Sequence, residues 1–115
     1  MYHIVDLSQE ASSPAAYENH PVAEVNDHVV RISIMTGAFP WHHHPNSDEG
    51  FWVLEGELMI EFEDEIVRLA PGKLLIIPKG VRHRTQPMGE RSVNLTFERA
   101  DAATVWCDRD CAVVG

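Results

Sequence analysis

The sequence is poor in cysteine. Its 115 residues contain two cysteines, Cys107 and Cys111, and their spacing matches neither a Cys-x-x-Cys redox pair nor a four-cysteine zinc framework. We expect two free thiols, with a minor metal or disulfide role as the alternative, because side chains four residues apart share one face of a helix. A chain of this length buries enough surface to fold without a disulfide framework. The sequence therefore predicts one domain that is stable without covalent cross-links.

Basic side chains are also scarce. Nine Lys and Arg residues stand against 18 Asp and Glu residues, which gives a formal net charge of −9. This charge repels a phosphate backbone, so we expect no nucleic-acid partner. The first ten residues include Asp6 and Glu10 and have no sustained apolar run, so neither a signal peptide nor a membrane span is expected there. We therefore expect a cytoplasmic protein.

Helical segments of 10 to 15 residues are missing between the apolar stretches of the chain. Instead, short apolar or alternating segments are separated by turn-forming residues, and the clearest predicted strands are residues 28–36, 51–55, 57–62, 66–69, 74–77, 83–86 and 92–98. About eight strands at such short spacing are typical of an antiparallel sandwich or barrel. The fold class that we expect is therefore all-β.

The ends of the chain have a different composition from its middle. Residues 1–20 are polar and small without a clear period, and they predict a partly extended N-terminal arm that needs the main body or a second subunit to order it. We expect residues 21–100 to form the β-barrel domain and residues 101–115 to form a short C-terminal segment. A short helix over residues 100–107 is expected where the two meet. The edge strands of a small barrel have unpaired backbone groups that must be protected. We expect the arm, together with the exposed apolar residues Ile4, Val22 and Val25, to protect them by pairing with a second subunit. We expect a homodimer.

Three consecutive histidines are the most informative local feature. In an extended chain His42 and His44 point to one side and His43 to the other, and a loop over residues 45–48 can bring Glu49 back beside the first two. Two imidazoles and a carboxylate suit a divalent iron, manganese, nickel, cobalt, copper or zinc ion. Without a metal, burial would strip these groups of water with no compensation. The pattern therefore favours a metal site.

The spacing around this cluster resembles the first motif of the cupin superfamily. His42-x-His44, four residues, Glu49, six residues and Gly56 match that motif. Gly72, five residues, Pro78-x-Gly80, two residues and His83 match the second motif of the same superfamily. The 15 residues between Gly56 and Gly72 are a short connection, similar to that of small bacterial cupins. The chain is thus identified as a small single-domain cupin.

This resemblance implies a double-stranded β-helix, or jelly-roll barrel, that holds one divalent metal ion per chain. His42, His44, Glu49 and His83 would coordinate the ion and leave one or two positions for water or substrate. A small molecule would bind in the barrel beside the ion. By strand alternation and position, we expect its pocket to be lined by Met35, Trp41, Phe51, Val53, Thr85, Asn94 and Thr96. Arg82 and Arg84 flank His83 and should point away from it, which does not favour a phosphosugar substrate; a contribution from Arg31 or Arg68 stays open.

Two classes of function remain open at this stage. The first is a metal-dependent enzyme on a small organic molecule, either a dioxygenase-like oxidoreductase or an isomerase in which the metal polarises a carbonyl group. No general base stands out in the sequence besides the expected ligands. The second is a non-catalytic module that binds or senses a small ligand. A fold by itself does not decide between them.

Overall fold

The computed structural model describes residues 2–12 and 17–106. In these ranges ten strands and one short helix follow in the order α1 (Leu7–Glu10), β1 (Tyr17–Val25), β2 (His28–Met35), β3 (Phe39–His43), β4 (Glu49–Glu55), β5 (Leu58–Glu61), β6 (Ile66–Leu69), β7 (Leu74–Ile77), β8 (His83–Pro87), β9 (Ser92–Arg99) and β10 (Val105–Trp106). All seven strands named from the sequence are confirmed, with ends that differ by at most two residues. The all-β prediction is therefore confirmed.

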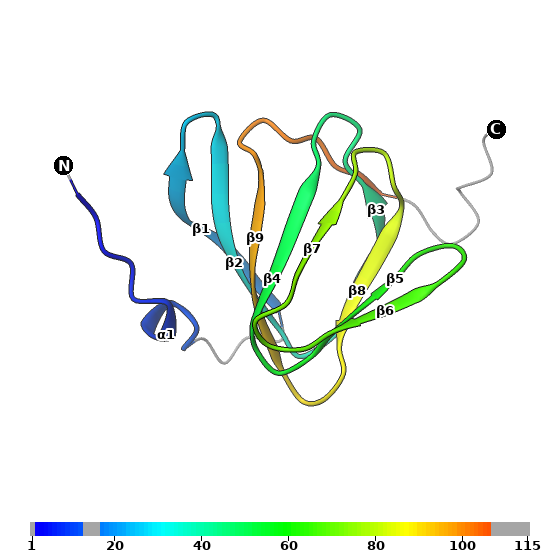
Figure 1. The fold of residues 1–115 in the computed structure, drawn as a ribbon, viewed down its shortest axis with the longest axis horizontal. Coiled ribbons are helices and arrows are strands. Elements are labelled where there is room, and N and C mark those ends of the chain that lie inside the picture. The colour runs from blue at the N-terminus through cyan, green and yellow to red at the C-terminus, as the bar shows by residue number, and fades with distance from the viewer. Residues whose placement is uncertain (1, 13–16, 107–115) are drawn as a thin grey trace.

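Two five-stranded antiparallel sheets face each other (Figure 1). The first has the strand order β1-β2-β9-β4-β7 and the second has the order β10-β3-β8-β5-β6. Consecutive strands such as β3 and β4 lie in different sheets, so the chain repeatedly crosses from one sheet to the other. This arrangement is the jelly-roll barrel that the sequence predicted.

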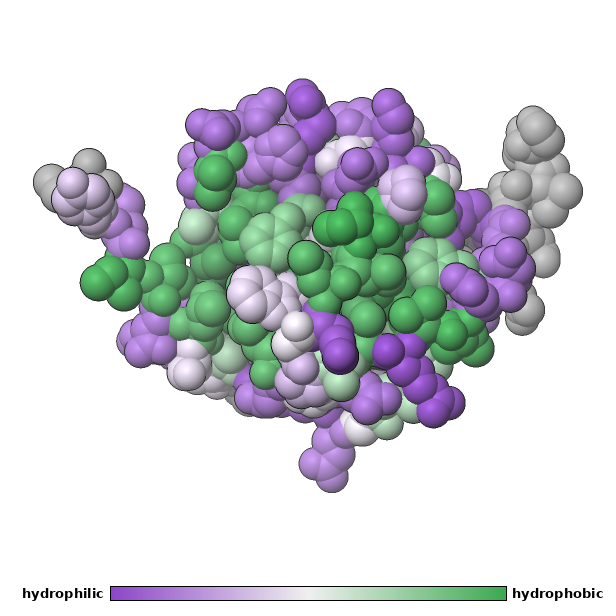
Figure 2. All heavy atoms as spheres, in the orientation of Figure 1, coloured by the Kyte–Doolittle hydropathy of each residue, from purple (hydrophilic) through white to green (hydrophobic). Residues whose placement is uncertain are grey.

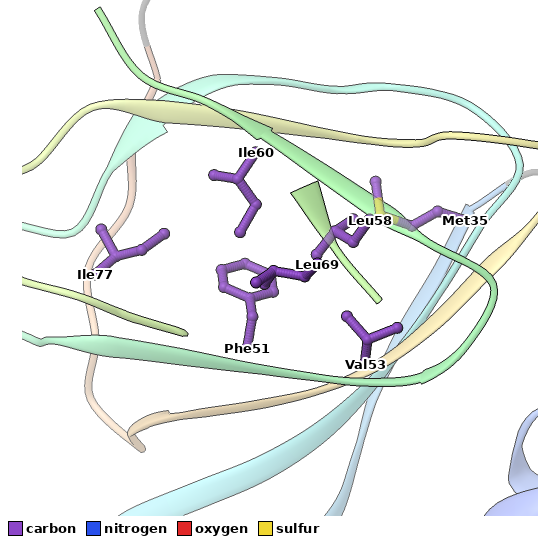
Figure 3. Close-up of a cluster of buried hydrophobic side chains, with 7 residues drawn as sticks. All are labelled: Met35, Phe51, Val53, Leu58, Ile60, Leu69 and Ile77. Carbon is purple, nitrogen blue, oxygen red and sulfur yellow. The ribbon is translucent and has the colours of Figure 1, made fainter. Parts of the chain in front are cut away.

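Apolar side chains from both sheets fill one part of the barrel. Phe51, on β4, points toward Ile60, which lies on β5 of the opposite sheet, and Val53 lies on the same side of β4 (Figure 3). Strand alternation explains why these residues share the interior, because positions two apart on a strand face the same side. The buried cluster consists of Met35, Phe51, Val53, Leu58, Ile60, Leu69 and Ile77.

A second apolar cluster lies on the outer face of the first sheet. Ile32 and Ile34, which alternate with the inward residues of β2, pack there with Val93 and Leu95. The N-terminal helix covers part of this face, since Leu7 packs against the cluster and Ala11 is buried in it (Figure 1). Asp6 caps this helix by accepting a hydrogen bond from the Gln9 amide at 3.2 Å. The arm of the protein is therefore anchored to its own barrel.

The two ends of the chain differ from the expectation in their local structure. β1 begins at Tyr17, inside the segment that the sequence assigned to the arm. The helix expected over residues 100–107 is wrong within the described part of the chain, because Val105 and Trp106 form a strand that pairs with His43 and His42 of β3. Pairing with an existing sheet edge outweighs the weak helical preference of this segment. Cys107 and Cys111 lie outside the described residues.

No helix in the described ranges is long and apolar enough to cross a membrane. The cytoplasmic location and the absence of a nucleic-acid partner stay predictions.

Candidate metal centre and its cavity

Four chemically active side chains meet between the two sheets. His42 lies on β3 and His83 on β8, where the two residues are direct partners in the register. His44 follows β3, and Glu49 opens β4 in the opposite sheet. One ligand atom from each of the four residues lies within 4.8 Å of the others, and all four are buried. The spacing predicted that His42, His44 and Glu49 come together, and the resemblance to the cupin motifs implied that His83 joins them.

The loop between His44 and Glu49 is held by hydrogen bonds to neighbouring segments. The Gly80 amide donates to the His44 carbonyl at 2.8 Å, and Asp48 accepts from the Lys79 amide at 2.8 Å. Asn46 both donates to the Asp101 carbonyl and accepts from the Ala103 amide. These hydrogen bonds hold the loop in a reversed direction, so that Glu49 lies beside the histidines.

Each of the three histidines has its Nδ1 atom on a backbone carbonyl. His42 contacts the Pro40 oxygen at 2.8 Å, His44 the Ala103 oxygen at 2.9 Å, and His83 the Val81 oxygen at 2.9 Å. A carbonyl only accepts, so Nδ1 carries the proton in each ring. In the neutral ring Nε2 then presents a lone pair toward the cluster. This is the ligand orientation found in protein metal sites.

The Glu49 carboxylate completes the fit to a cation. Its Oε1 atom lies 3.2 Å from Nε2 of His44 and 3.3 Å from Nε2 of His83. Nε2 of His44 has no hydrogen-bond partner in the described part of the chain. Lone pairs that face a carboxylate oxygen in a buried site need a positive charge between them. The four residues therefore suit a divalent metal ion.

The pKa values show how strongly these groups are coupled. Burial, with help from the nearby His83, lowers the pKa of His42 to about 4. Burial also acts against a charge on His44, but the Glu49 carboxylate outweighs it and raises the His44 pKa to about 9. For Glu49, burial opposes the charged form, yet His44 and His83 lower its pKa to about 2. The carboxylate is thus charged at neutral pH.

A cavity of about 360 Å³ opens beside the cluster, and His42, His44 and Glu49 form part of its wall. Of the seven residues expected in the pocket wall, three lie in it, namely Phe51, Thr85 and Thr96. Phe39 also lines it, because the β3–β8 register shifts between Phe39 and His42 and brings both residues to the inner side.

The other four residues expected in the wall lie elsewhere. Met35 and Val53 belong to the apolar core, and Asn94 is fully buried and donates to the Ser92 hydroxyl at 3.3 Å. Trp41 packs under the guanidinium groups of Arg82 and Arg84, at 5.3 and 5.6 Å from its ring centroid. Neighbours on a strand point to opposite faces, so Trp41 is on the outside where His42 is inside.

The structure adds cavity residues that the sequence analysis missed. Glu98 lines the cavity, with its Oε2 atom 3.9 Å from Nε2 of His44. Burial and the nearby Glu49 charge raise the pKa of Glu98. Alternation along β9 was the available signal, because Glu98 follows Asn94 and Thr96 on the same face. Arg31, Asn19 and Tyr17 also line the cavity, from β1 and β2.

Comparison with known proteins agrees with this architecture. Residues 28–97 match the model of the cupin domain family Cupin_2. The chain is 46% identical over 106 residues to the uncharacterized protein YdbB of Bacillus subtilis, which covers 91% of each protein.

Solved structures show the same fold. A cupin-2 domain protein from Shewanella frigidimarina superposes with a TM-score of 0.78 at 31% identity, covering 84% of this chain and 94% of the other. The DMSP lyase DddQ from Ruegeria pomeroyi superposes with a TM-score of 0.68 at 23% identity, covering 85% of this chain and 57% of the lyase. By its sequence, its strand topology and its buried histidine and glutamate cluster, the chain belongs to the cupin domain family.

Proposed function

We propose that this protein is a metal-dependent enzyme that acts on a small organic molecule held in the barrel. His42, His44, Glu49 and His83 would hold one divalent ion, and the cavity beside them would hold the substrate. Such an ion supplies Lewis-acid or redox chemistry to a bound small molecule. The observation that carries the proposal is the cavity of about 360 Å³ that shares three of the four cluster residues, since a purely structural metal site has no need of one.

Glu98 favours the isomerase-like form of this function over the dioxygenase-like form. A proton-transfer reaction needs a base that is not itself a metal ligand, and Glu98 lies in the cavity close to the cluster. Its raised pKa brings it closer to neutral pH, where a carboxyl group can both take up and release a proton. We propose that Glu98 moves a proton to or from the substrate.

Metal analysis and reactivity together test this function. Plasma mass spectrometry of tag-free protein should find about one equivalent of iron, manganese, nickel, cobalt, copper or zinc per chain. The variants His44→Ala and Glu49→Ala should lose the metal, and His43→Ala, which changes the neighbouring but outward-facing imidazole, should keep it. No metal after anaerobic reconstitution would overturn the proposal and leave a ligand-binding barrel.

Reactivity separates the enzyme classes. We expect NMR in D₂O to show deuterium exchange at carbon next to the carbonyl group of small carbonyl compounds, and Glu98→Gln should abolish the exchange while keeping the metal. Oxygen consumption in an electrode, with no exchange, would instead support the dioxygenase-like form. If the protein binds the metal but shows neither deuterium exchange nor oxygen consumption with any of the compounds, a sensing or binding module is favoured.

We also propose that the protein is a homodimer. The outer face of the first sheet carries exposed apolar side chains over β4 and β7, among them Trp52, Leu74 and Ile76, with exposed fractions of 42%, 59% and 54% (Figure 2). An apolar patch of this kind on a small domain is typical of an interface. Sedimentation velocity at micromolar concentration should show a dimer, and Ile76→Lys should shift it toward the monomer. A wild-type protein that sediments only as a monomer would contradict the dimer.

A further inference from the structure

We propose that the substrate is a small planar monocarboxylate, aromatic or unsaturated, whose carboxylate is bound by Arg31. This proposal rests on the function proposed above and names the substrate class of the same cavity. It is carried by a row of polar side chains on β1 and β2, by unpartnered polar atoms on β9, and by aromatic rings on the opposite wall.

The polar row follows from the pairing of β1 with β2. Asn19 pairs with Ser33, and Arg31 lies two positions along β2 from Ser33, so the three side chains face the same side of the sheet. All three line the cavity together with Tyr17. Arg31 is the only Lys or Arg among the described residues that line it. The one permanent cation of the cavity wall thus sits in a row of hydrogen-bonding groups.

The Arg31 guanidinium is held in place by its neighbours. Its terminal nitrogen Nη1 donates to Oδ1 of Asn19 at 3.2 Å, and the Asn19 side-chain amide in turn donates to the Tyr17 hydroxyl at 3.2 Å. Its Nε atom lies 3.7 Å from Glu98, longer than a hydrogen bond. A guanidinium has five N–H donors, and the bond to Asn19 uses one of them. The remaining donors suit the two oxygens of a carboxylate, which bind in a bidentate pair.

Two of the cavity-lining side chains on β9 each have a buried oxygen atom with no hydrogen-bond partner in the described chain. Thr96, the register partner of Arg31, is 2% exposed, and its hydroxyl has no hydrogen-bond partner among the described residues. Oε2 of Glu98 is likewise buried without a hydrogen-bond partner in the described chain. Buried polar atoms in native proteins are nearly always hydrogen-bonded, to protein, to ordered water or to a ligand. A substrate hydroxyl group would satisfy either atom, and a substrate carbonyl oxygen would satisfy the Thr96 hydroxyl alone.

The charges of the site favour a single negative charge on the substrate. A divalent ion with three neutral imidazoles and the Glu49 carboxylate carries a net charge of about +1. Arg31 and Glu98 carry opposite charges in the same cavity. Because the charges of Arg31 and Glu98 cancel, the site as a whole keeps a net charge of about +1. This charge matches a monoanion better than a phosphate dianion.

The opposite sheet contributes two aromatic rings to the other wall, Phe39 from β3 and Trp106 from β10, and Tyr17 of β1 reaches across from the first sheet to stack on Phe39. Phe39 lies between Tyr17 and Trp106, with ring centroids 4.8 and 5.2 Å away, and all three residues line the cavity. Flat, rigid rings pack best against a flat substrate through stacked or edge-to-face contacts. The cavity volume of about 360 Å³ is at the small end of ligand pockets, which limits the substrate to about one ring.

Isothermal titration calorimetry with benzoate and its neutral analogue benzamide tests the proposal on the metal-loaded protein. We expect benzoate to bind at least about tenfold more tightly than benzamide, because a charge-assisted pair is worth more than a neutral hydrogen bond. Arg31→Gln should abolish this preference and Arg31→Lys should keep part of it. Arg68→Gln, which changes an exposed arginine on β6, should behave as the wild type. Unchanged metal content and melting temperature show that each variant is folded.

Other results would overturn the proposal in distinguishable ways. Equal affinity for benzoate and benzamide in the wild type, or no binding of either, removes the carboxylate assignment. If Arg31→Gln keeps the preference for benzoate and Glu49→Ala loses it, the carboxylate binds the metal rather than Arg31. The role of Arg31 is then wrong, while the proposed metal-dependent function is unaffected. If cyclohexanecarboxylate binds as tightly as benzoate, the planar shape is wrong. An Arg31-dependent preference in a protein that takes up no metal supports the substrate class while the metalloenzyme function fails.

Discussion

Nε2 of His44 lies 3.2 Å from Oε1 of Glu49, although His44 follows β3 of one sheet and Glu49 opens β4 of the other. The backbone contact of His44 Nδ1 aims the Nε2 lone pair at this carboxylate. Two electron-rich atoms at this distance in a buried site are stable only with a cation between them. Without a metal, a proton has that role, which explains the raised pKa of His44.

Metal removal should therefore lower the stability of the barrel. An ion at about 1,000 times its dissociation constant stabilises the folded state by about 4 kcal/mol. For a domain of this size that corresponds to a melting temperature about 15 °C higher. Differential scanning calorimetry with and without EDTA measures the shift. Glu49→Gln, which keeps the shape and removes the charge, should show a much smaller difference; an equal shift in both proteins would mean that the ion binds elsewhere.

The metal-free protein should be most stable near pH 6.5. The His42 pKa is about 4 in the folded state and 6.5 ordinarily, so below pH 6.5 the unfolded chain takes up a proton that the folded chain does not, and stability falls by up to about 3 kcal/mol toward pH 4. The His44 pKa is about 9 when folded, so its contribution is complete below pH 6.5 and is lost as the pH rises to 9. Urea unfolding in EDTA at pH 5, 6.5 and 8.5 measures this profile. His42→Gln should flatten its acidic side only.

Gly56 and Gly72 offer a matched pair of substitutions. Both have positive φ angles, +74° and +86°, so alanine costs about 1–2 kcal/mol of backbone strain at either position. At Gly56 the added Cβ would also lie 2.1 Å from the Arg91 carbonyl oxygen, whereas at Gly72 no atom lies within 4 Å. Gly56→Ala should therefore destabilise the protein by at least about 3 kcal/mol, and Gly72→Ala by no more than about 2 kcal/mol. Equal losses in urea unfolding would show that the turn after β4 relaxes.

Trp41 should contribute to stability and not to the cavity. It is 6% exposed and packs against Arg82 and Arg84 on the outer face of the second sheet. Trp41→Leu should lower the free energy of unfolding by about 1–3 kcal/mol through lost packing and cation–π contacts, with the metal content unchanged. Phe39→Leu is the comparison on the inner side, because Phe39 contacts the His42 ring with centroids 5.0 Å apart. If Trp41→Leu changed ligand binding as strongly as Phe39→Leu, the outward position of Trp41 would be contradicted.

Local patterns in the sequence determined the class of the fold and the residues of the cluster. The alternation in residues 28–36 and 92–98 predicted β2 and β9, because the side-chain period of a strand is written directly into the order of residues. The spacing of His42, His44 and Glu49 predicted their convergence for the same reason. The resemblance to the two cupin motifs, and not local spacing, implied that His83 would meet them.

Only the tertiary structure decided which residues surround that cluster. Both faces of β2 are apolar or buried in part, so periodicity alone does not say that Ile32 faces outward and Arg31 inward. The register shift between Phe39 and His42 brings Phe39 into the cavity, and such a bulge has no signature in a single sequence. Glu98, Arg31 and Trp106 come from three separate strands and meet only when both sheets close. Contacts between residues far apart in the chain depend on pairing and burial, which act on the whole barrel and not on any one segment.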